Sequence, residues 1–303
     1  MPDIPYIQTS VFVDNRYGFG GNQLATFWNA KSNESLNQEI MQGIALEMNF
    51  SESTFIEKPT KSDYIVKVRI FTPARELRFA GHPTIGTAFV LKESGILKSS
   101  SRHAIMELGI GPIPVDYLDN GAIRMKQNEP EFLEMWGDKV SIASALGISS
   151  NAIDTRSPMQ WVSTGFPFLM VPMKSLEAVK SASPNSPEIL SALEGQISKQ
   201  IVLFSTETEN SDSHLHVRMF GPEVGVVEDP ATGSAAGPLA AYVEQYNLLN
   251  RDLPGQDIII EQGYEIRRPS RLTASIIGEK DFTGVYVSGL TRLVAKGTFF
   301  IEE

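Results

Sequence analysis

The 303-residue sequence contains no cysteine. This absence excludes disulfide bonds, thiolate zinc sites, iron–sulfur clusters and a cysteine nucleophile. Long apolar runs are absent as well, since no stretch approaches the ~18 consecutive apolar residues that a membrane-spanning helix needs. The first residues lack a basic segment followed by an apolar one, so no signal peptide is predicted. A chain without cysteine fits a reducing compartment best, and we expect it to be cytoplasmic.

Basic residues are scarce relative to acidic ones. The 26 lysines and arginines face 36 aspartates and glutamates, which gives a net charge of −10. A field of that sign repels phosphate groups, so we expect neither nucleic acid nor a membrane surface as a partner. With 42% apolar and 20% charged residues, the composition is that of a globular protein. The length predicts two domains of roughly 150 residues each.

The sequence repeats itself at an offset of about half its length. VRIFTP at 68–73 matches VRMFGP at 217–222, an offset of 217 − 68 = 149 residues. Each copy is followed by a glycine-containing turn and an apolar helical pattern; FAGHPTIGT leads into the first helix and EDPATGSA into the second. Alternation before the first turn predicts a strand. Two features in the same order at nearly one offset indicate two similar halves.

The remaining patterns predict an α+β architecture. Apolar residues recur at helical spacing over 34–48, and Ser186-Pro187 is typical of a helix start. The last third alternates like strands, in DIIIEQ, RLTASII, TGVYVSG and RLVAKGTFFIE. Many alternating strands and few long helices predict halves built from curved, mostly antiparallel sheet. We place the first half at 1–128 and the second at 129–289, with the last strand, about 290–303, returning to the first half.

Ionisable side chains lie close to the glycine-containing turns. His82 lies in the first turn, and Asp229 and Ser234 lie in the second. The exposed N–H groups at a helix start favour a carboxylate or phosphate, although no nucleotide-binding glycine pattern is present. Glu52 lies between two serines where the chain turns into an apolar strand. A glutamate in such a place is more often a solvated helix-end charge than a functional group.

Two of the four histidines belong to a D-x-H-x-H pattern formed by Asp212, His214 and His216. On a strand both imidazoles would face the same side, as a pair of metal ligands would. No third ligand with a sensible spacing is evident, so no metal is predicted. We interpret the pair as polar side chains on an exposed strand face, and His103 as a surface loop residue.

Longer motifs make a resemblance visible. They are GNQLATF, EMNFSESTF, VRIFTP followed by E-L-x-FAGHPTIGTA, RMFGPEVGVVEDPATGSAAGPLA and QGYEIRRPS. Together, and in this order, they resemble the PhzF family of phenazine-biosynthesis-like proteins over essentially the whole chain. The resemblance implies the fold of the related diaminopimelate epimerase, in which each of two similar halves wraps a sheet around a central helix and the active site lies in the cleft between them. It also implies isomerisation of a dihydro-hydroxyanthranilate without a cofactor.

The family's functional residues fall on matching positions of this chain. The glutamate that moves a proton between two carbons falls on Glu52, and the other catalytic residues fall on His82, Asp229 and Ser234. The residues that would bind the substrate are Asn22, Gly81 and Gly233. Diaminopimelate epimerase and its racemase relatives use two cysteines as acid and base. That two-thiol mechanism is excluded here, because this chain has no cysteine.

The expected partner is a small-molecule carboxylate, and the resemblance suggests a homodimer. Two other functions remain open from the sequence. One is a racemase or epimerase that uses carboxylates as acid and base, and the other is a non-catalytic protein that binds a small molecule. Exchange of a carbon-bound hydrogen with solvent separates both enzymes from the binding protein.

Overall fold

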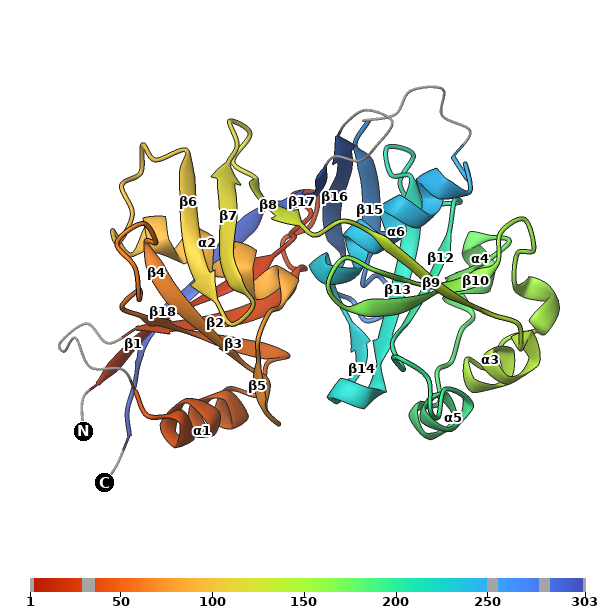
Figure 1. The fold of residues 1–303 in the computed structure, drawn as a ribbon, viewed down its shortest axis with the longest axis horizontal. Coiled ribbons are helices and arrows are strands. Elements are labelled where there is room, and N and C mark those ends of the chain that lie inside the picture. Colours follow the sequence, from red (N-terminus) through yellow and green to blue (C-terminus); the bar gives the residue numbers. More distant parts are fainter. Residues whose placement is uncertain (1–2, 29–35, 250–255, 278–283, 302–303) are drawn as a thin grey trace. The chain divides into compact units, whose positions relative to one another are not determined.

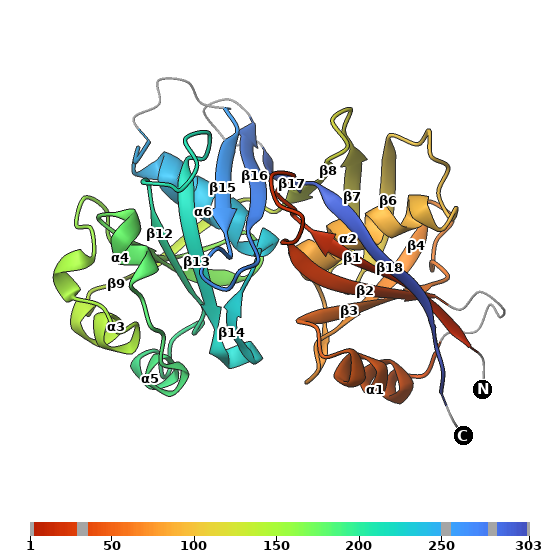
Figure 2. The same cartoon turned by 180° about the vertical axis from the view of Figure 1, so that it is seen from behind.

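The computed structural model describes residues 3–28, 36–249, 256–277 and 284–301. Contacts divide the chain into two compact units. The first unit comprises Met1–Asn15, Gly21–Lys126 and Ser288–Glu303, and the second comprises Arg16–Gly20 and Gln127–Val287. Each unit combines a many-stranded sheet with few helices, as Figures 1 and 2 show. The predicted α+β class is therefore confirmed.

The first unit is built from the N-terminal elements and the last strand of the chain. Its elements are β1 (Ile4–Val11), β2 (Asn22–Trp28), α1 (Gln38–Met48), β3 (Glu52–Glu57), β4 (Val66–Phe71), β5 (Glu76–Leu77), α2 (Gly81–Glu93), β6 (His103–Leu108), β7 (Gly111–Tyr117), β8 (Ile123–Gln127) and β18 (Thr291–Phe299). Strand β18 pairs antiparallel with β1. The unit therefore joins strands from the two ends of the chain.

The second unit holds the middle of the chain. Its elements are β9 (Glu131–Trp136), α3 (Lys139–Ala145), η1 (Ser150–Ala152), β10 (Met159–Ser163), β11 (Pro167–Pro172), α4 (Leu176–Lys180), α5 (Ser186–Ala192), β12 (Ile201–Ser205), β13 (Leu215–Gly221), η2 (Pro222–Val224), β14 (Val226–Asp229), α6 (Gly233–Gln245), β15 (Ile258–Gln262), β16 (Ser270–Ile277) and β17 (Gly284–Gly289). The four alternating patterns near the C-terminus correspond to β15, β16, β17 and β18, and two predicted end residues, Thr283 and Glu302, lie outside the described residues.

The two units repeat one strand topology. In the first, β1–β2 is antiparallel, β2–β3 parallel, β3–β4 antiparallel, β4–β6 parallel and β6–β7 antiparallel. In the second, β10–β11, β11–β12, β12–β13, β13–β15 and β15–β16 follow the same sequence of directions. The outer neighbours match as well, since β9 pairs with β10 as β18 pairs with β1. The internal repeat read from VRIFTP and VRMFGP therefore extends over whole sheets.

Each unit has one helix that is buried on all sides. In α2 the buried residues run without a break from Gly81 to Ala88, and in α6 from Ala235 to Val243. Figures 1 and 2 show both helices lying among the strands of their own units. Gly86 permits the close approach of α2 to the sheet, because a Cβ there would lie 2.5 Å from Leu24 Cδ2 and 2.7 Å from Val11 Cγ2. The absence of a polar stripe on α2 follows from its burial on every face.

Helix α1 begins later than its apolar spacing predicts. It spans Gln38–Met48 rather than 34–48, and residues 34 and 35 lie outside the described residues. The start is fixed by Asn37, whose side-chain oxygen accepts a hydrogen bond from the Ile40 amide at 2.8 Å. The helix ends at Asn49 in the left-handed conformation, with φ of 50°. This sharp end turns the chain so that β3 begins only three residues later, at Glu52.

Candidate active site

Three of the residues singled out in the sequence lie together in the first unit. Glu52 opens β3, which runs parallel to β2 with Leu24 opposite Glu52. Asn22 opens β2, and His82 is the second residue of α2. Because β2 and β3 are parallel, their first residues lie at the same end of the sheet. The start of α2 lies there too, as the distances between these side chains establish.

The side chains of Glu52, His82 and Asn22 form a compact group. Glu52 Oε2 lies 3.5 Å from His82 Nε2, and their side chains are 15% and 5% exposed. His82 Nδ1 lies 3.1 Å from the amide nitrogen of Asn22. The Ser51 hydroxyl donates a hydrogen bond to Asn22 Oδ1 at 3.1 Å, which orients the amide. The Nδ1 atom of His82 thus faces the Asn22 amide, whereas Nε2 faces Glu52 and makes no hydrogen bond among the described residues.

His82 is a neutral group in this setting. Burial lowers the pKa of His82 to about 3. The 3.5 Å contact with Glu52 is therefore not an ion pair between two charged side chains. A neutral imidazole can form a hydrogen bond with the carboxyl group or with a bound molecule, but it adds no positive charge to the site.

The second unit carries a matching turn at the start of α6. Asp229 ends β14, Thr232 precedes the helix, and Gly233 and Ser234 open it. The Thr232 hydroxyl donates a 2.5 Å hydrogen bond to Asp229 Oδ2, and Asp229 is 7% exposed. The Gly233 carbonyl accepts a hydrogen bond from Gln127 Nε2 at 2.8 Å. The start of α6 is thus held by side chains from outside the helix.

The seven residues chosen from the sequence therefore form two groups, one in each unit. Asn22, Glu52, Gly81 and His82 lie in the first, and Asp229, Gly233 and Ser234 in the second. The sequence reasoning missed residues that orient these groups, namely Ser51, Gln127, Thr232 and Gln262. The repeat carries a signal for one of them, because a threonine stands at 232 where the first copy has Ala80.

The repeat also shows that the glutamate is present once. Ser53 pairs with Phe71 in β3–β4, and Ile201 pairs with Phe220, the counterpart of Phe71, in β12–β13. The residue before Ile201, Gln200, thus takes the place of Glu52 in the second unit. A single carboxylate, rather than a symmetric pair, is available at this position for proton transfer.

The interpretation of His214 and His216 as side chains on an exposed strand face is wrong, because His214 precedes β13 and is half-buried, and His216 lies within the buried strand. Every residue of β13 is buried, because the strand pairs with β12 on one side and with β15 on the other. His216 is fully buried and lies 2.8 Å from both Glu261 and Glu265. Burial alone would lower the pKa of His216, but hydrogen bonds and charges of the two carboxylates raise it to about 9. The imidazole is therefore the cation of a buried ion triad.

The other histidines have structural partners as well. His214 Nδ1 accepts a hydrogen bond from the Ile259 amide at 2.8 Å. His103 opens β6 instead of lying in a loop, and its side chain is 55% exposed, 2.9 Å from Asp116. Within the described parts of the chain, no group of three or more histidine, aspartate or glutamate side chains is arranged to hold a metal ion. None of the helices in those parts has both the length and the apolar character to cross a membrane.

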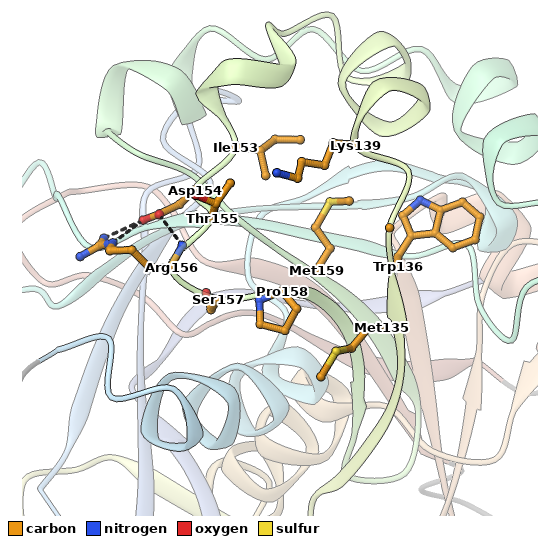
Figure 3. A pocket seen from close by; sticks show the side chains of 11 residues that line it. Met135, Trp136, Lys139, Ile153, Asp154, Thr155, Arg156, Ser157, Pro158 and Met159 are labelled. Atoms are coloured by element: carbon orange, nitrogen blue, oxygen red, sulfur yellow. Dashed lines mark hydrogen bonds and ion pairs between the residues drawn. The ribbon is translucent and has the colours of Figure 1, made fainter.

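A surface pocket of the second unit shares no residue with either group. It has a volume of about 480 Å³ and lies between residues 135–139 and 153–159. Figure 3 shows its charged side chains, of which Asp154 and Arg156 pair with each other at 2.7 Å. It contains none of the residues selected from the sequence. We therefore take the group at the start of α2 in the first unit and the group at the start of α6 in the second as the candidate functional groups.

Comparisons with known proteins agree with the motifs. The family model described as phenazine biosynthesis-like protein (PhzC-PhzF) matches residues 10–297. A trans-2,3-dihydro-3-hydroxyanthranilate isomerase of Pseudomonas chlororaphis is 35% identical over 286 residues, covering 93% of this chain and 94% of its own. The crystal structure of a PhzF-family phenazine biosynthesis protein of Bacillus anthracis has a TM-score of 0.89 at 28% identity, covering 99% of this chain and 100% of that one.

A more distant structure shares the fold alone. The hydroxyproline epimerase of Agrobacterium vitis has a TM-score of 0.64 at 10% identity, with 98% of this chain and 92% of that chain covered. The relatives named for an activity at 30% identity or more are isomerases, which indicates an enzyme of the isomerase class. With nearly the whole sequence matched, this chain belongs to the phenazine biosynthesis-like (PhzC-PhzF) family.

Proposed function

We propose that the protein is a cofactor-independent isomerase that moves a proton between two carbons of a small cyclic carboxylate. The substrate class follows from the relatives named trans-2,3-dihydro-3-hydroxyanthranilate isomerase. The observation that carries the proposal is the position of Glu52 at the start of β3, 3.5 Å from an imidazole that burial keeps neutral. A single carboxylate beside a neutral imidazole suits a group that alternates between base and acid.

In this mechanism Glu52 acts as general base and then as general acid. It takes the proton from a carbon of the substrate, and the electron pair of that C–H bond moves into the adjacent unsaturated system. Glu52 then returns the proton to a second carbon, so the substrate is neither oxidised nor reduced. Positioned proton transfer of this kind contributes about 10²- to 10⁴-fold to a rate. His82 Nε2, which faces Glu52, would form a hydrogen bond with the carboxyl group or with a polar group of the substrate.

The remaining selected residues would bind the substrate. The N–H groups of Gly81 and Gly233 lie at starts of helices, where the helix dipole favours an anion such as a carboxylate. Asp229 and Ser234 would accept or donate hydrogen bonds to the amino and hydroxyl groups of the substrate. Asn22 would act through His82, whose Nδ1 it contacts at 3.1 Å.

The test is isomerisation of trans-2,3-dihydro-3-hydroxyanthranilate in deuterated water, followed by proton NMR and mass spectrometry. We expect a shifted double bond and deuterium at the carbon that receives the proton. A racemase or epimerase would instead exchange a hydrogen at a stereocentre of an amino acid and invert it. A protein that only binds the compound would leave all its carbon-bound hydrogens unexchanged, and this result would refute the proposal.

We also propose that the chain forms a homodimer, as the family resemblance suggests. Sedimentation velocity provides the measurement. A species of 33.3 kDa, the mass of one chain, at all micromolar concentrations would contradict this proposal.

A further inference from the structure

We infer that Gln262 is a positioning residue of the candidate site, which orients the Asp229 carboxylate through the hydroxyl of Thr232. This inference rests on the proposed function, in which Asp229 binds a polar group of the substrate. Gln262 ends β15 and is 2% exposed. It lies 33 residues beyond Asp229 in the sequence, and the fold brings the two together.

The hydrogen bonds of Gln262 fix the direction of each donor. The Thr232 amide donates to Gln262 Oε1 at 3.1 Å, so the atom facing that N–H must be the oxygen of the side-chain amide. The other end, Nε2, then donates to the Asp229 carbonyl at 2.7 Å and to the Thr232 hydroxyl oxygen at 2.9 Å. All three hydrogen bonds join Gln262 to the four-residue turn from Asp229 to Thr232.

The hydroxyl of Thr232 transmits this orientation to the carboxylate. A hydroxyl has one hydrogen, and its oxygen already accepts from Gln262 Nε2. The hydrogen is therefore directed away from Gln262 and toward Asp229 Oδ2, where the distance is 2.5 Å. Gln262 thus determines which way the Thr232 hydroxyl points, and that hydroxyl holds one oxygen of Asp229 in place.

The internal repeat argues that the fold itself does not require this network. Leu77 pairs with Ile70 as Asp229 pairs with Met219, so Leu77 is the counterpart of Asp229. Glu107 pairs with Lys67 as Glu261 pairs with His216, which makes the next residue, Leu108, the counterpart of Gln262. The helix-preceding residue Thr232 corresponds to Ala80. The first unit builds the same turn with Leu77, Ala80 and Leu108.

The close packing beneath the turn is common to both copies. A Cβ on Gly263 would lie 2.6 Å from the Pro230 carbonyl oxygen, and one on Gly109 would lie 2.9 Å from Arg78 Cα. Gly263 follows Gln262 in the sequence, and Gly109 follows Leu108, the counterpart of Gln262. In both copies this glycine approaches the turn closely, although Gly263 has a φ of +81° and Gly109 lacks a positive φ, whereas the polar triad of Asp229, Thr232 and Gln262 belongs to the second unit alone among the described residues. A network added to a turn that folds without it points to a functional role.

The experiment compares Gln262→Met and Thr232→Val with the conservative Thr232→Ser, using isomerisation of trans-2,3-dihydro-3-hydroxyanthranilate. The first two variants should lower kcat/KM by about 10- to 100-fold, by analogy with the loss found when residues that orient metal-ligating side chains are removed. Thr232→Ser keeps the hydroxyl and should stay within about threefold of wild type. Gln160→Met is the matched control, because Gln160 is also buried and hydrogen-bonded, to the Leu133 carbonyl and the Tyr246 hydroxyl, yet contacts neither helix start.

A double-mutant cycle with Asp229→Asn separates positioning from a general loss of structure. If Gln262 acts through Asp229, then Gln262→Met should cost less than about threefold further once Asp229 is already changed. An equal loss in both backgrounds, a loss in Gln160→Met of the same size, or wild-type kinetics for Gln262→Met would overturn the inference. These outcomes leave the proposed function intact, provided that wild type isomerises the compound.

Amide hydrogen exchange tests the same geometry without a substrate. Gln262→Met should accelerate exchange at the Thr232 amide, which loses its acceptor, and should leave the amide of Ala80 in the first unit unchanged. If wild type fails to isomerise the compound, the proposed function fails. The positioning inference is then decided by exchange, and an unchanged Thr232 amide would reject it.

Discussion

His82 places a neutral imidazole 3.5 Å from the carboxylate of Glu52. Burial lowers the pKa of His82 to about 3, so at neutral pH the pair has at most the single charge of the glutamate. A protonated imidazole in this position would attract the carboxylate and resist its protonation. A neutral one lets Glu52 alternate between its two protonation states, which is what a group that takes up and returns a proton must do.

The first prediction concerns Glu52. Glu52→Gln keeps the shape and hydrogen-bonding capacity of the side chain but cannot carry a proton, so turnover should fall by at least ~10²-fold. Binding of trans-2,3-dihydro-3-hydroxyanthranilate, measured by calorimetry, should stay close to that of wild type. Glu47→Gln is the control, because Glu47 lies exposed on α1. An active Glu52 variant beside an inactive Glu47 variant would show that the wrong glutamate was chosen.

The second prediction concerns the protonation of His82. The pKa of His82 is about 3 in the folded protein against 6.5 for an ordinary histidine, so between these values the unfolded chain binds more protons. Stability contributed by this site is therefore present above pH 6.5 and is lost as the pH falls toward 3. Urea unfolding at pH 6.5 and at about pH 4 should show a smaller decrease for His82→Asn than for wild type. An equal decrease in the two proteins would mean that His82 becomes protonated normally in the folded state.

The third prediction concerns the ion triad of His216, and its pH dependence has the opposite sign. The pKa of His216 is raised to about 9, so its contribution to stability is complete below pH 6.5 and is lost as the pH rises from 6.5 to 9. His216→Gln removes the cation between the buried carboxylates of Glu261 and Glu265, which should cost about 3–5 kcal/mol at neutral pH. The difference from wild type should shrink toward pH 9.

The control for the triad is His103→Gln. His103 and Asp116 form a partly exposed pair at 2.9 Å, so the loss should stay below about 1 kcal/mol. The measurement is the denaturant midpoint of four proteins, namely wild type, His216→Gln, His103→Gln and Glu265→Gln. A loss at His216 no larger than that at His103 would contradict the account of a charged, buried imidazole.

Local patterns were sufficient to predict much of the fold. The alternating residues of β15 to β18 and the turn motifs before α2 and α6 each favour one backbone conformation. These preferences depend only on residues that are close together in the sequence. The similarity of VRIFTP and VRMFGP predicted similar halves, because strands with similar side chains pack against similar neighbours. The start of α1 was misplaced, since the apolar spacing extends past Asn37, the residue whose side chain caps the helix.

The residues that orient the candidate site were out of reach of the sequence. Gln262 forms a hydrogen bond with Thr232 because β15 pairs with β13 in one particular register. The sequence around position 262 does not predict that pairing. His216 was misread for the same reason, since its burial depends on β12 and β15 lying on either side of β13. Motifs predict the groups proposed to bind the substrate, whereas the residues that orient those groups depend on strand order.

The last prediction uses two glycines to separate helix stability from helix packing. Both Gly43 and Gly86 lie inside helices, where glycine is less favourable than alanine by roughly 0.5–1 kcal/mol. A Cβ on Gly43 would meet no atom within 4 Å, so Gly43→Ala should stabilise the protein by about that amount. A Cβ on Gly86 would lie 2.5 Å from Leu24 Cδ2 and 2.7 Å from Val11 Cγ2, two fully buried side chains that have little room to move.

Gly86→Ala should therefore destabilise the protein by about 1–3 kcal/mol, the usual cost of an overpacked core. It should also reduce turnover, because α2 carries His82 and any displacement of the helix changes the 3.5 Å separation from Glu52. Gly43→Ala leaves this separation untouched and should retain wild-type kcat. Thermal unfolding and isomerisation assays on both variants check the two statements. A stabilised and fully active Gly86→Ala protein would show that α2 does not press against β1 and β2 as tightly as described.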